Sequence, residues 1–254
     1  MSQTAATRYL NALVEHGIEY FFVNAGTDFA PIVEAYALNK DNNPALPTPV
    51  LCAHENLAGG MAHGAALVTG RPQALMLHVN VGTANAACSV ANASRDRIPL
   101  LVTAGRSPIL EGGAVGARDL PIHWSQEMFD QASLVREFVK WDYELRDPRQ
   151  VESVVDRAVS VASAHPRGPV YLALPREVLA ERRRTPRCRS HARPFRPPCN
   201  PIPTPSRRSP TGSPPPSSRS SWPRPTAWSP NLLSCWAMSP LASGSVWPIR
   251  GLAT

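Results

Sequence analysis

The sequence has 254 residues, 43% of them hydrophobic, which is enough for one large or two small globular domains with a buried core. Its formal charge of +7 is unevenly distributed, because twelve Arg and no Lys, Asp or Glu follow residue 181. The part before residue 182 therefore has 14 basic and 19 acidic residues and a charge of −5. The basic character belongs to the last 73 residues, and binding of nucleic acid by the main part is not expected.

The cysteine spacing and the N-terminal sequence argue against metal-binding, disulfide-rich, secreted and membrane proteins. The five Cys form no CxxC pair, so zinc ribbons and disulfide scaffolds have no support, and we expect no metal ligands in this chain. The N-terminus has no basic segment followed by an apolar one, and the longest uncharged stretch is interrupted by Pro230 and Pro240. We therefore expect no secretory signal, no membrane segment and a cytoplasmic protein.

Helix-like and strand-like segments alternate up to about residue 181. In "TRYLNALVEHG" the apolar residues follow the helical i, i+3, i+4 spacing and Gly17 suits a left-handed cap, and "EYFFV" at 19–23 then indicates a buried strand. The further predicted elements are a helix near 29–38, a strand at 49–53, a helix at 55–68 ending at Gly70, a strand at 73–79, a helix near 83–94, strands at 99–103 and in "EFVKWDY", a helix at 148–164 and a strand at 169–174. This alternation predicts an α/β domain, residues 1–181, with a mostly parallel sheet covered by helices on both faces.

Beyond residue 181 the periodicity stops, since 16 Pro and 13 Ser share 73 residues with the twelve Arg. This composition predicts a disordered tail, residues 182–254. Two interpretations stay open: a basic, Pro-rich interaction arm, or the product of a GC-rich gene read in a shifted frame. The nucleotide sequence after codon 181, read in the other two frames, would distinguish them.

Three stretches follow predicted strands, where open parallel sheets bind their ligands. They are "NAGTDF" (24–29), "HEN" (54–56) and "HVNVGTAN" (78–85). Taken alone, Glu55 fits a solvated carboxylate at a helix N-terminus, and His78 fits an ordinary core histidine. Gly26 and Gly82 would by default be tight turns. The residues by themselves thus indicate only an α/β ligand-binding domain.

These motifs together resemble a known family, the thiamine-diphosphate-dependent enzymes that act on 2-oxo acids, which includes benzoylformate decarboxylase and the acetolactate synthase large subunit. The resemblance runs from about residue 5 to 179, through "NAGTDF", "HENLAGGMAHGAALVTGRP", "LHVNVGTANA", "IPLLVTAGR", "VKWDYE" and "RGPVYLALPREV". It covers the N-terminal, pyrimidine-binding domain of that family.

The resemblance implies roles for particular residues. Glu55 matches the glutamate that hydrogen-bonds N1′ of the cofactor's aminopyrimidine ring, and we expect its carboxyl group to lie among apolar neighbours such as Leu57 and Met61. His78 matches a catalytic histidine that donates or accepts a proton, and Thr27 matches a serine that contacts the substrate carboxylate. The other implied cofactor-binding residues are Ala25, Gly26, Asn80, Gly82 and Asn85, the last three in a loop over the cofactor or as structural caps.

The resemblance also implies partners. The family holds the diphosphate through Mg²⁺ on another domain with a GDG motif, and no GDG occurs in these 254 residues. We therefore expect a truncated chain that is inactive alone, from a decarboxylase or carboligase of 2-oxo acids whose full-length form is a homodimer or tetramer. The alternative is a non-catalytic α/β scaffold that carries a basic Pro-rich arm.

Overall fold

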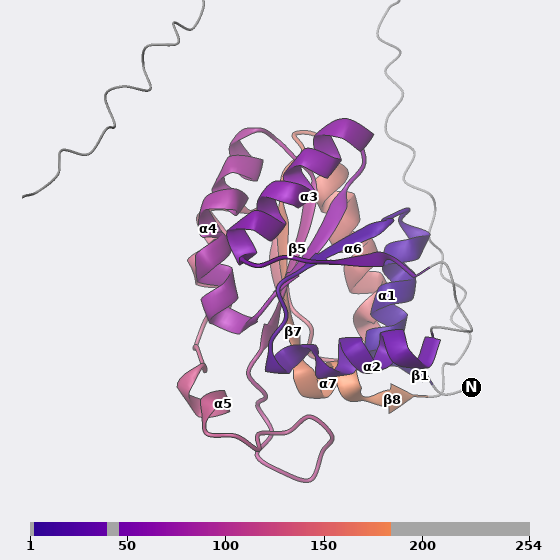
Figure 1. Ribbon diagram of the computed structural model, residues 1–254, viewed down its shortest axis with the longest axis vertical. Coiled ribbons are helices and arrows are strands. Elements are labelled where there is room, and N and C mark those ends of the chain that lie inside the picture. Colours follow the sequence, from indigo (N-terminus) through magenta and orange to yellow (C-terminus); the bar gives the residue numbers. More distant parts are fainter. Residues whose placement is uncertain (1–2, 40–45, 184–254) are drawn as a thin grey trace, which may run out of the picture. The chain divides into compact units, whose positions relative to one another are not determined.

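The structure is a computed structural model that describes residues 3–39 and 46–183 (Figure 1). Of the predicted tail, only Arg182 and Arg183 fall within this part. These two residues form a strand that pairs with residues 3–4, so the expectation of disorder was wrong for them. For residues 184–254 that expectation, together with the two interpretations of the tail, lies outside the described residues. In the described part, no helix is both long enough and apolar enough to cross a membrane.

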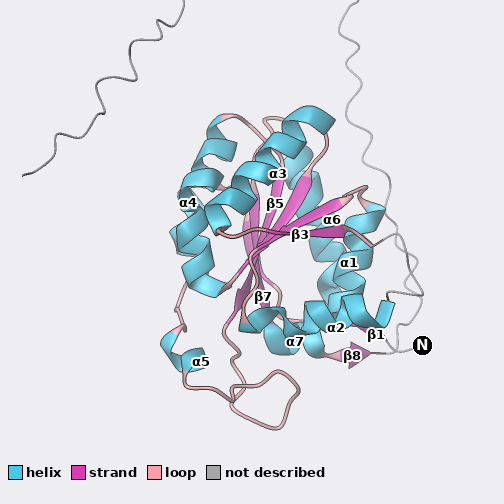
Figure 2. Cartoon of the chain, viewed as in Figure 1, coloured by secondary structure: helices cyan, strands magenta, loops and turns pink. Residues whose placement is uncertain are grey.

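The centre of the described domain is a six-stranded sheet in which all neighbouring strands are parallel, in the order β3-β2-β4-β5-β7-β6. Its strands are β2 (Tyr20–Val23), β3 (Thr48–Leu51), β4 (Gln73–Leu77), β5 (Leu100–Arg106), β6 (Asp142–Glu144) and β7 (Val170–Pro175). A separate antiparallel pair joins β1 (Gln3–Thr4) to β8 (Arg182–Arg183). The predicted mostly parallel sheet is thus confirmed (Figure 2).

Helices cover both faces of this sheet, as predicted (Figure 1). The α-helices are α1 (Ala5–Glu15), α2 (Ala30–Asn39), α3 (Glu55–Thr69), α4 (Val79–Arg95), α5 (Ile122–Ser125), α6 (Val151–Ser163) and α7 (Arg176–Ala180). Short 3₁₀ helices are η1 (Thr27–Phe29), η2 (Gln131–Leu134), η3 (Arg136–Phe138) and η4 (Pro148–Gln150). The first core cluster lies under α1, α2, α6 and α7, and the second lies under α3 and α4.

The sequence explains why the central strands lie inside. Every residue of β4 and β7 is buried, because each strand is an apolar run with helices on both sides. Helices α3 and α4 pack closely through small residues, and a Cβ atom at Gly59 would lie 2.0 Å from the Ser89 hydroxyl. Their helix–helix contact therefore depends on the absence of a side chain at position 59.

Most predicted boundaries agree with the structure to within a few residues. Gly17 and Gly70 both have positive φ, +72° and +67°, as their predicted capping positions require. The prediction for "EFVKWDY" was largely wrong, because residues 136–138 form η3 and only 142–144 form a strand. The side chain of Arg136 bonds both Asp130 and Asp142, and backbone pairing with β7 begins only at Lys140, whose N–H donates to the Pro169 carbonyl.

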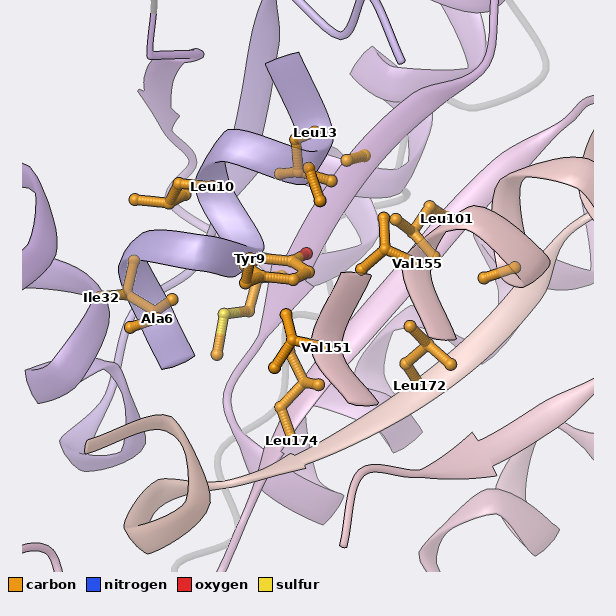
Figure 3. Packing of buried hydrophobic residues seen from close by; sticks show 14 of the residues in the cluster. Ala6, Tyr9, Leu10, Leu13, Ile32, Leu101, Val151, Val155, Leu172 and Leu174 are labelled. Atoms are coloured by element: carbon orange, nitrogen blue, oxygen red, sulfur yellow. The ribbon is translucent and has the colours of Figure 1, made fainter. Parts of the chain in front are cut away.

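Tyr9 of α1 lies at the centre of the first core cluster, surrounded by side chains of α1, α6 and the sheet (Figure 3). Its ring is fully buried, and its hydroxyl lies 3.2 Å from the Thr103 hydroxyl. Thr103 donates to the carbonyl of Leu75, so the Tyr9 hydroxyl donates to Thr103. Burial raises the pKa of Tyr9 well above its ordinary value, and the ring stays neutral.

We expect Tyr9→Phe to lower the free energy of unfolding by about 1 kcal/mol, because it removes one buried hydrogen bond while keeping the ring. Urea unfolding followed by circular dichroism would measure the change. Tyr20→Phe is the matched control, since Tyr20 is 47% exposed, and it should leave stability unchanged. Equal effects of the two substitutions would contradict the buried bond.

Candidate functional site

The strand order places a topological switch point between β2 and β4. Both strands are parallel neighbours, but β2 leads into η1 and α2 on one face of the sheet, whereas β4 leads into α4 on the other. Loops that diverge in this way leave a crevice beyond the carboxyl ends of the strands, which is where open α/β sheets bind ligands. Residues 24–29 and His78 lie at this switch point, and Glu55 begins α3 beside them.

Glu55 is the first residue of α3 and is 7% exposed. Its Oε2 accepts a hydrogen bond of 3.0 Å from the Asn85 side-chain amide. No other hydrogen bond to the Glu55 carboxyl group is present within residues 3–39 and 46–183. A nearly buried carboxyl group with one oxygen unpaired by these residues can receive a hydrogen bond from a ligand.

Gly82 keeps room beside this carboxyl group. A Cβ atom at position 82 would lie 3.3 Å from Glu55 Oε1 and 3.3 Å from Leu77 Cβ, which is tight enough that one of these groups would have to shift. The three predicted residues Glu55, Gly82 and Asn85 are therefore brought together. They come from the N-terminal ends of two neighbouring helices, α3 and α4.

The helix predicted near 83–94 begins earlier than expected, and of the two interpretations of Asn80, Gly82 and Asn85, a loop over the cofactor or structural caps, the structure has no loop there. Helix α4 begins at Val79, so Asn80, Gly82 and Asn85 lie in its first two turns. The backbone N–H of Gly82 donates to the His78 carbonyl at 2.7 Å, and the Thr83 hydroxyl donates to the Val79 carbonyl at 2.8 Å. These bonds close the first turn directly after β4.

His78 follows β4 and has partners on both ring nitrogens. Its Nδ1 lies 2.5 Å from Asp28 Oδ1, and its Nε2 lies 3.2 Å from the side-chain amide nitrogen of Gln126. The hydrogen bond to Asp28 raises the pKa of His78 above its ordinary value of 6.5, burial opposes this, and the charges of Asp28 and Glu55 add to it. A histidine held in this way favours its protonated form and can act as a general acid.

Val79, next to His78, has a strained backbone. Its φ of +35° is in the left-handed region, which a β-branched residue rarely adopts and which costs roughly 1–3 kcal/mol. Its N–H points to Asp28 Oδ2 at 3.4 Å, and its side chain is buried. Strain of this kind gathers at functional sites, and here it turns the chain sharply from β4 into α4.

Two glycines make room for the Asp28–His78 pair. A Cβ atom at Gly26 would lie 2.1 Å from His78 Nδ1, and one at Gly105 would lie 1.7 Å from Asp28 Oδ2. Gly26 has an extended φ of −143°, which any residue can adopt. A glycine is needed here because the His78 ring lies close to its backbone, not because the chain makes a left-handed turn. The predicted residues Gly26 and His78 are therefore in contact.

The remaining predicted residues lie around this pair. Ala25 and Thr27 are exposed in the segment that follows β2. Asn80 is partly exposed, and its Oδ1 accepts from the Val81 N–H at 2.9 Å, so this side-chain bond lies within the first turn of α4. Leu57 and Met61, expected as apolar neighbours of Glu55, are 50% and 39% exposed, because they lie on the outer side of α3.

Sequence reasoning missed Asp28 and Gln126. Asp28 lies within the quoted "NAGTDF", and an acidic residue one position after Thr27 was the available signal. Gln126 comes from the long segment after β5, where no periodicity indicated its position. The structure also has a cleft of about 1480 Å³, lined by Arg106, Glu144 and Glu177 among others. None of the predicted site residues lines this cleft. Within the described residues, no group of three His, Cys, Asp or Glu forms a metal site.

Comparison with known proteins now identifies the class. Residues 3–134 match the family model described as thiamine pyrophosphate enzyme, N-terminal TPP binding domain. The chain is 31% identical over 163 residues to benzoylformate decarboxylase of Pseudomonas aeruginosa, and 27% identical over 182 residues to sulfoacetaldehyde acetyltransferase of Rhodobacter capsulatus. These matches cover 64% and 71% of this chain but 28% of each relative.

A solved structure gives the same result. The thiamine diphosphate-dependent 4-hydroxybenzoylformate decarboxylase of Rhodococcus jostii RHA1 superposes with a TM-score of 0.59 and 26% identity, over 70% of this chain and 31% of that one. The chain therefore belongs to the thiamine pyrophosphate enzymes, as a member of their N-terminal, cofactor-binding domain family. It spans about three tenths of the length of the relatives it matches.

The residues present fit thiamine diphosphate, another name for thiamine pyrophosphate. The nearly buried Glu55 carboxyl group can accept a hydrogen bond from a protonated ring nitrogen, and Gly82 leaves space beside it. The aminopyrimidine ring of the cofactor offers such a nitrogen together with a flat apolar face. A polar group with this environment suits a heterocycle better than a free ion.

Gly105→Ala should destabilise the protein by roughly 1 to 3 kcal/mol, because the added methyl group overlaps the buried Asp28 carboxyl group. Thermal or urea unfolding would measure this. Gly64→Ala is the matched control: nothing lies within 4 Å of its added Cβ in the middle of α3, so stability should stay equal or rise. A neutral Gly105→Ala would show that Asp28 does not lie against β5.

Proposed function

We propose that residues 1–181 form the pyrimidine-binding domain of a thiamine-diphosphate-dependent decarboxylase or carboligase of 2-oxo acids. The single observation that carries this proposal is the Glu55 carboxyl group, which is nearly buried at the start of α3. Among the described residues only Asn85 hydrogen-bonds it, and His54 Nδ1 lies 4.0 Å from the same oxygen. The relatives' names, benzoylformate decarboxylase and acetolactate synthase among them, support the substrate class.

In this proposal each described residue has one task. Glu55 holds a proton at N1′ of the aminopyrimidine ring, and Asn85 orients its carboxyl group. His78 exchanges a proton with the reacting substrate, and Thr27 contacts the substrate carboxylate. Ala25 and Gly82 let the aminopyrimidine ring approach the backbone, Gly26 leaves room for the imidazole of His78, and Asn80 shapes the start of α4. When bound, the cofactor supplies the carbon nucleophile that makes cleavage beside a 2-oxo group possible.

Other groups belong to the complete enzyme. Mg²⁺ and the diphosphate would be held by a different domain, and a homodimer or tetramer would place this domain against that one. Several large apolar side chains of α3 and α4 are exposed, including Leu57, Leu67, Val68 and Val81, and they offer a face for such contact. The alternative of a scaffold with a basic arm rests on residues 184–254, which lie outside the described part, so no described residue favours it.

The test uses a chimaera in which residues 3–183 replace the matching segment of the P. aeruginosa relative, which supplies the rest of that protein. Calorimetry with thiamine diphosphate and Mg²⁺ would measure cofactor binding. We expect binding, together with release of carbon dioxide from at least one 2-oxo acid. A folded chimaera that binds no cofactor would contradict the proposal.

Glu55→Gln in this chimaera should slow exchange of the cofactor's C2 proton by at least about 10²-fold, because an amide can hydrogen-bond the ring but cannot pass it a proton. Exchange into deuterated water, followed by NMR, gives the rate. Glu19→Gln is the control, since Glu19 is exposed at a surface ion pair with Arg71 and should not affect exchange. Unchanged exchange in Glu55→Gln would refute its role.

Thr27 offers a test of the substrate contact. Thr27→Val keeps the shape of the side chain but removes its hydroxyl group, and we expect kcat/KM for 2-oxo acids to fall at least about tenfold. Thr27→Ser keeps the hydroxyl group and should retain most activity. Steady-state kinetics of both variants would decide, and equal losses would assign Thr27 a purely structural part.

A further inference from the structure

The Asp28–His78 pair joins the two segments that follow β2 and β4 at the switch point of the sheet. Asp28 comes from η1 after β2, and His78 comes from the end of β4. Their side chains are 2% and 18% exposed, and Asp28 Oδ1 lies 2.5 Å from His78 Nδ1. A hydrogen bond this short, with one partner almost fully buried, holds the imidazole ring in one orientation.

The surroundings of Asp28 show that the pair is built into the fold. Gly26 contacts the ring and Gly105 contacts the carboxyl group, and neither position could carry a Cβ atom without displacing the pair. The other carboxyl oxygen of Asp28 faces the N–H of the strained residue Val79 at 3.4 Å. One carboxyl group thus contacts both the ring of His78 and the backbone turn that follows it.

The other charged groups around this pair are already engaged. Arg106, at the end of β5, and Arg176, of α7, line the same small cavity as Asp28, as does His123 of α5. Arg106 pairs with Glu144, while Arg176 contacts Asp119 and the ring of His123. Glu55 of α3 adds a negative charge near His78, and Tyr171 of β7, whose pKa is about 12, stays neutral. Among these groups, His78 is the one whose side chain directly contacts the Asp28 carboxyl group.

We infer that Asp28 is a positioning residue for His78: it accepts the Nδ1–H of the ring, fixes that tautomer, and directs Nε2 toward Gln126 as the nitrogen that exchanges protons. The direction of the pKa shift of His78 agrees with this arrangement, since the hydrogen bond to Asp28 is its largest cause. The use of this proton in catalysis rests on the function proposed above. The pairing itself does not depend on the cofactor.

Gln126 completes the arrangement. Its amide nitrogen donates to Nε2 when the ring is neutral, and rotation of the amide by half a turn presents its oxygen to the protonated ring. The ring can thus keep both hydrogen bonds in either protonation state. A histidine bonded in this way can change its charge without moving, which is what a proton-transferring group requires.

The test is an NMR titration of the histidine side chains in the full 254-residue chain without cofactor. In the unchanged protein we expect the pKa of His78 to lie above 6.5 and the neutral ring to keep its proton on Nδ1. Asp28→Asn should lower the pKa of His78 by at least about one unit, because it removes a negative charge and its hydrogen bond.

Asp156→Asn is the matched control. Asp156 lies 2.7 Å from Nε2 of His16 and forms a second Asp–His contact, which involves neither Asp28 nor His78. Loss of the Asp156 carboxylate should therefore leave the titration of His78 unchanged. An unchanged pKa of His78 in folded Asp28→Asn would overturn the inference. If that variant does not fold, the unchanged protein still decides, because a neutral ring with its proton on Nε2 would also overturn it.

The outcomes separate this inference from the proposed function. Loss of cofactor binding by the chimaera would contradict the function while the titration of His78 still reported its pairing with Asp28. A His78 titration independent of Asp28 would contradict the inference while Glu55 could still bind the cofactor.

Discussion

The parallel pairing of β2 with β4 is the constraint on which the site depends. Their register, with Val23 opposite Met76, ends both strands at the same edge of the sheet, while the following segments turn to opposite faces. Side chains separated by about fifty positions in the chain therefore meet beyond that edge. The short bond between Asp28 and His78 spans this gap, and the nearly buried Glu55 lies at the start of the adjacent helix.

Buried polar contacts behind the site hold the strands in place. The Tyr171 hydroxyl bonds both the Thr83 hydroxyl of α4 and the Gln131 amide, each at 2.8 Å, and Gln131 also donates to the Gly105 carbonyl. This network links β5, β7 and the first turn of α4 through fully buried atoms. Because each group is satisfied, the low polarity of its surroundings strengthens these bonds and makes the arrangement rigid.

The sequence predicted the layered sheet, because apolar runs such as β4 and β7 bury on both faces and leave a clear pattern. Because the three segments 24–29, 54–56 and 78–85 each follow a predicted parallel strand, the sequence also predicted that they lie at one edge of the sheet. It missed the start of α4, since the turn at Val79 relies on a left-handed backbone that residue preferences disfavour. Asp28 and Gln126 were missed for another reason: their partner is remote in the chain, and only the folded sheet brings them to His78.

The strained turn at Val79 sets the position from which the side chain of residue 78 extends. Its geometry comes from the bonds of Gly82 and Thr83 to the backbone, from the buried side chain of Val79, and from Asp28, which faces the Val79 N–H with one carboxyl oxygen and the His78 ring with the other. Most of the contacts that hold the turn after β4 are therefore made by residues other than His78. Another side chain at position 78 would therefore leave the path of the backbone from β4 into α4 largely unchanged.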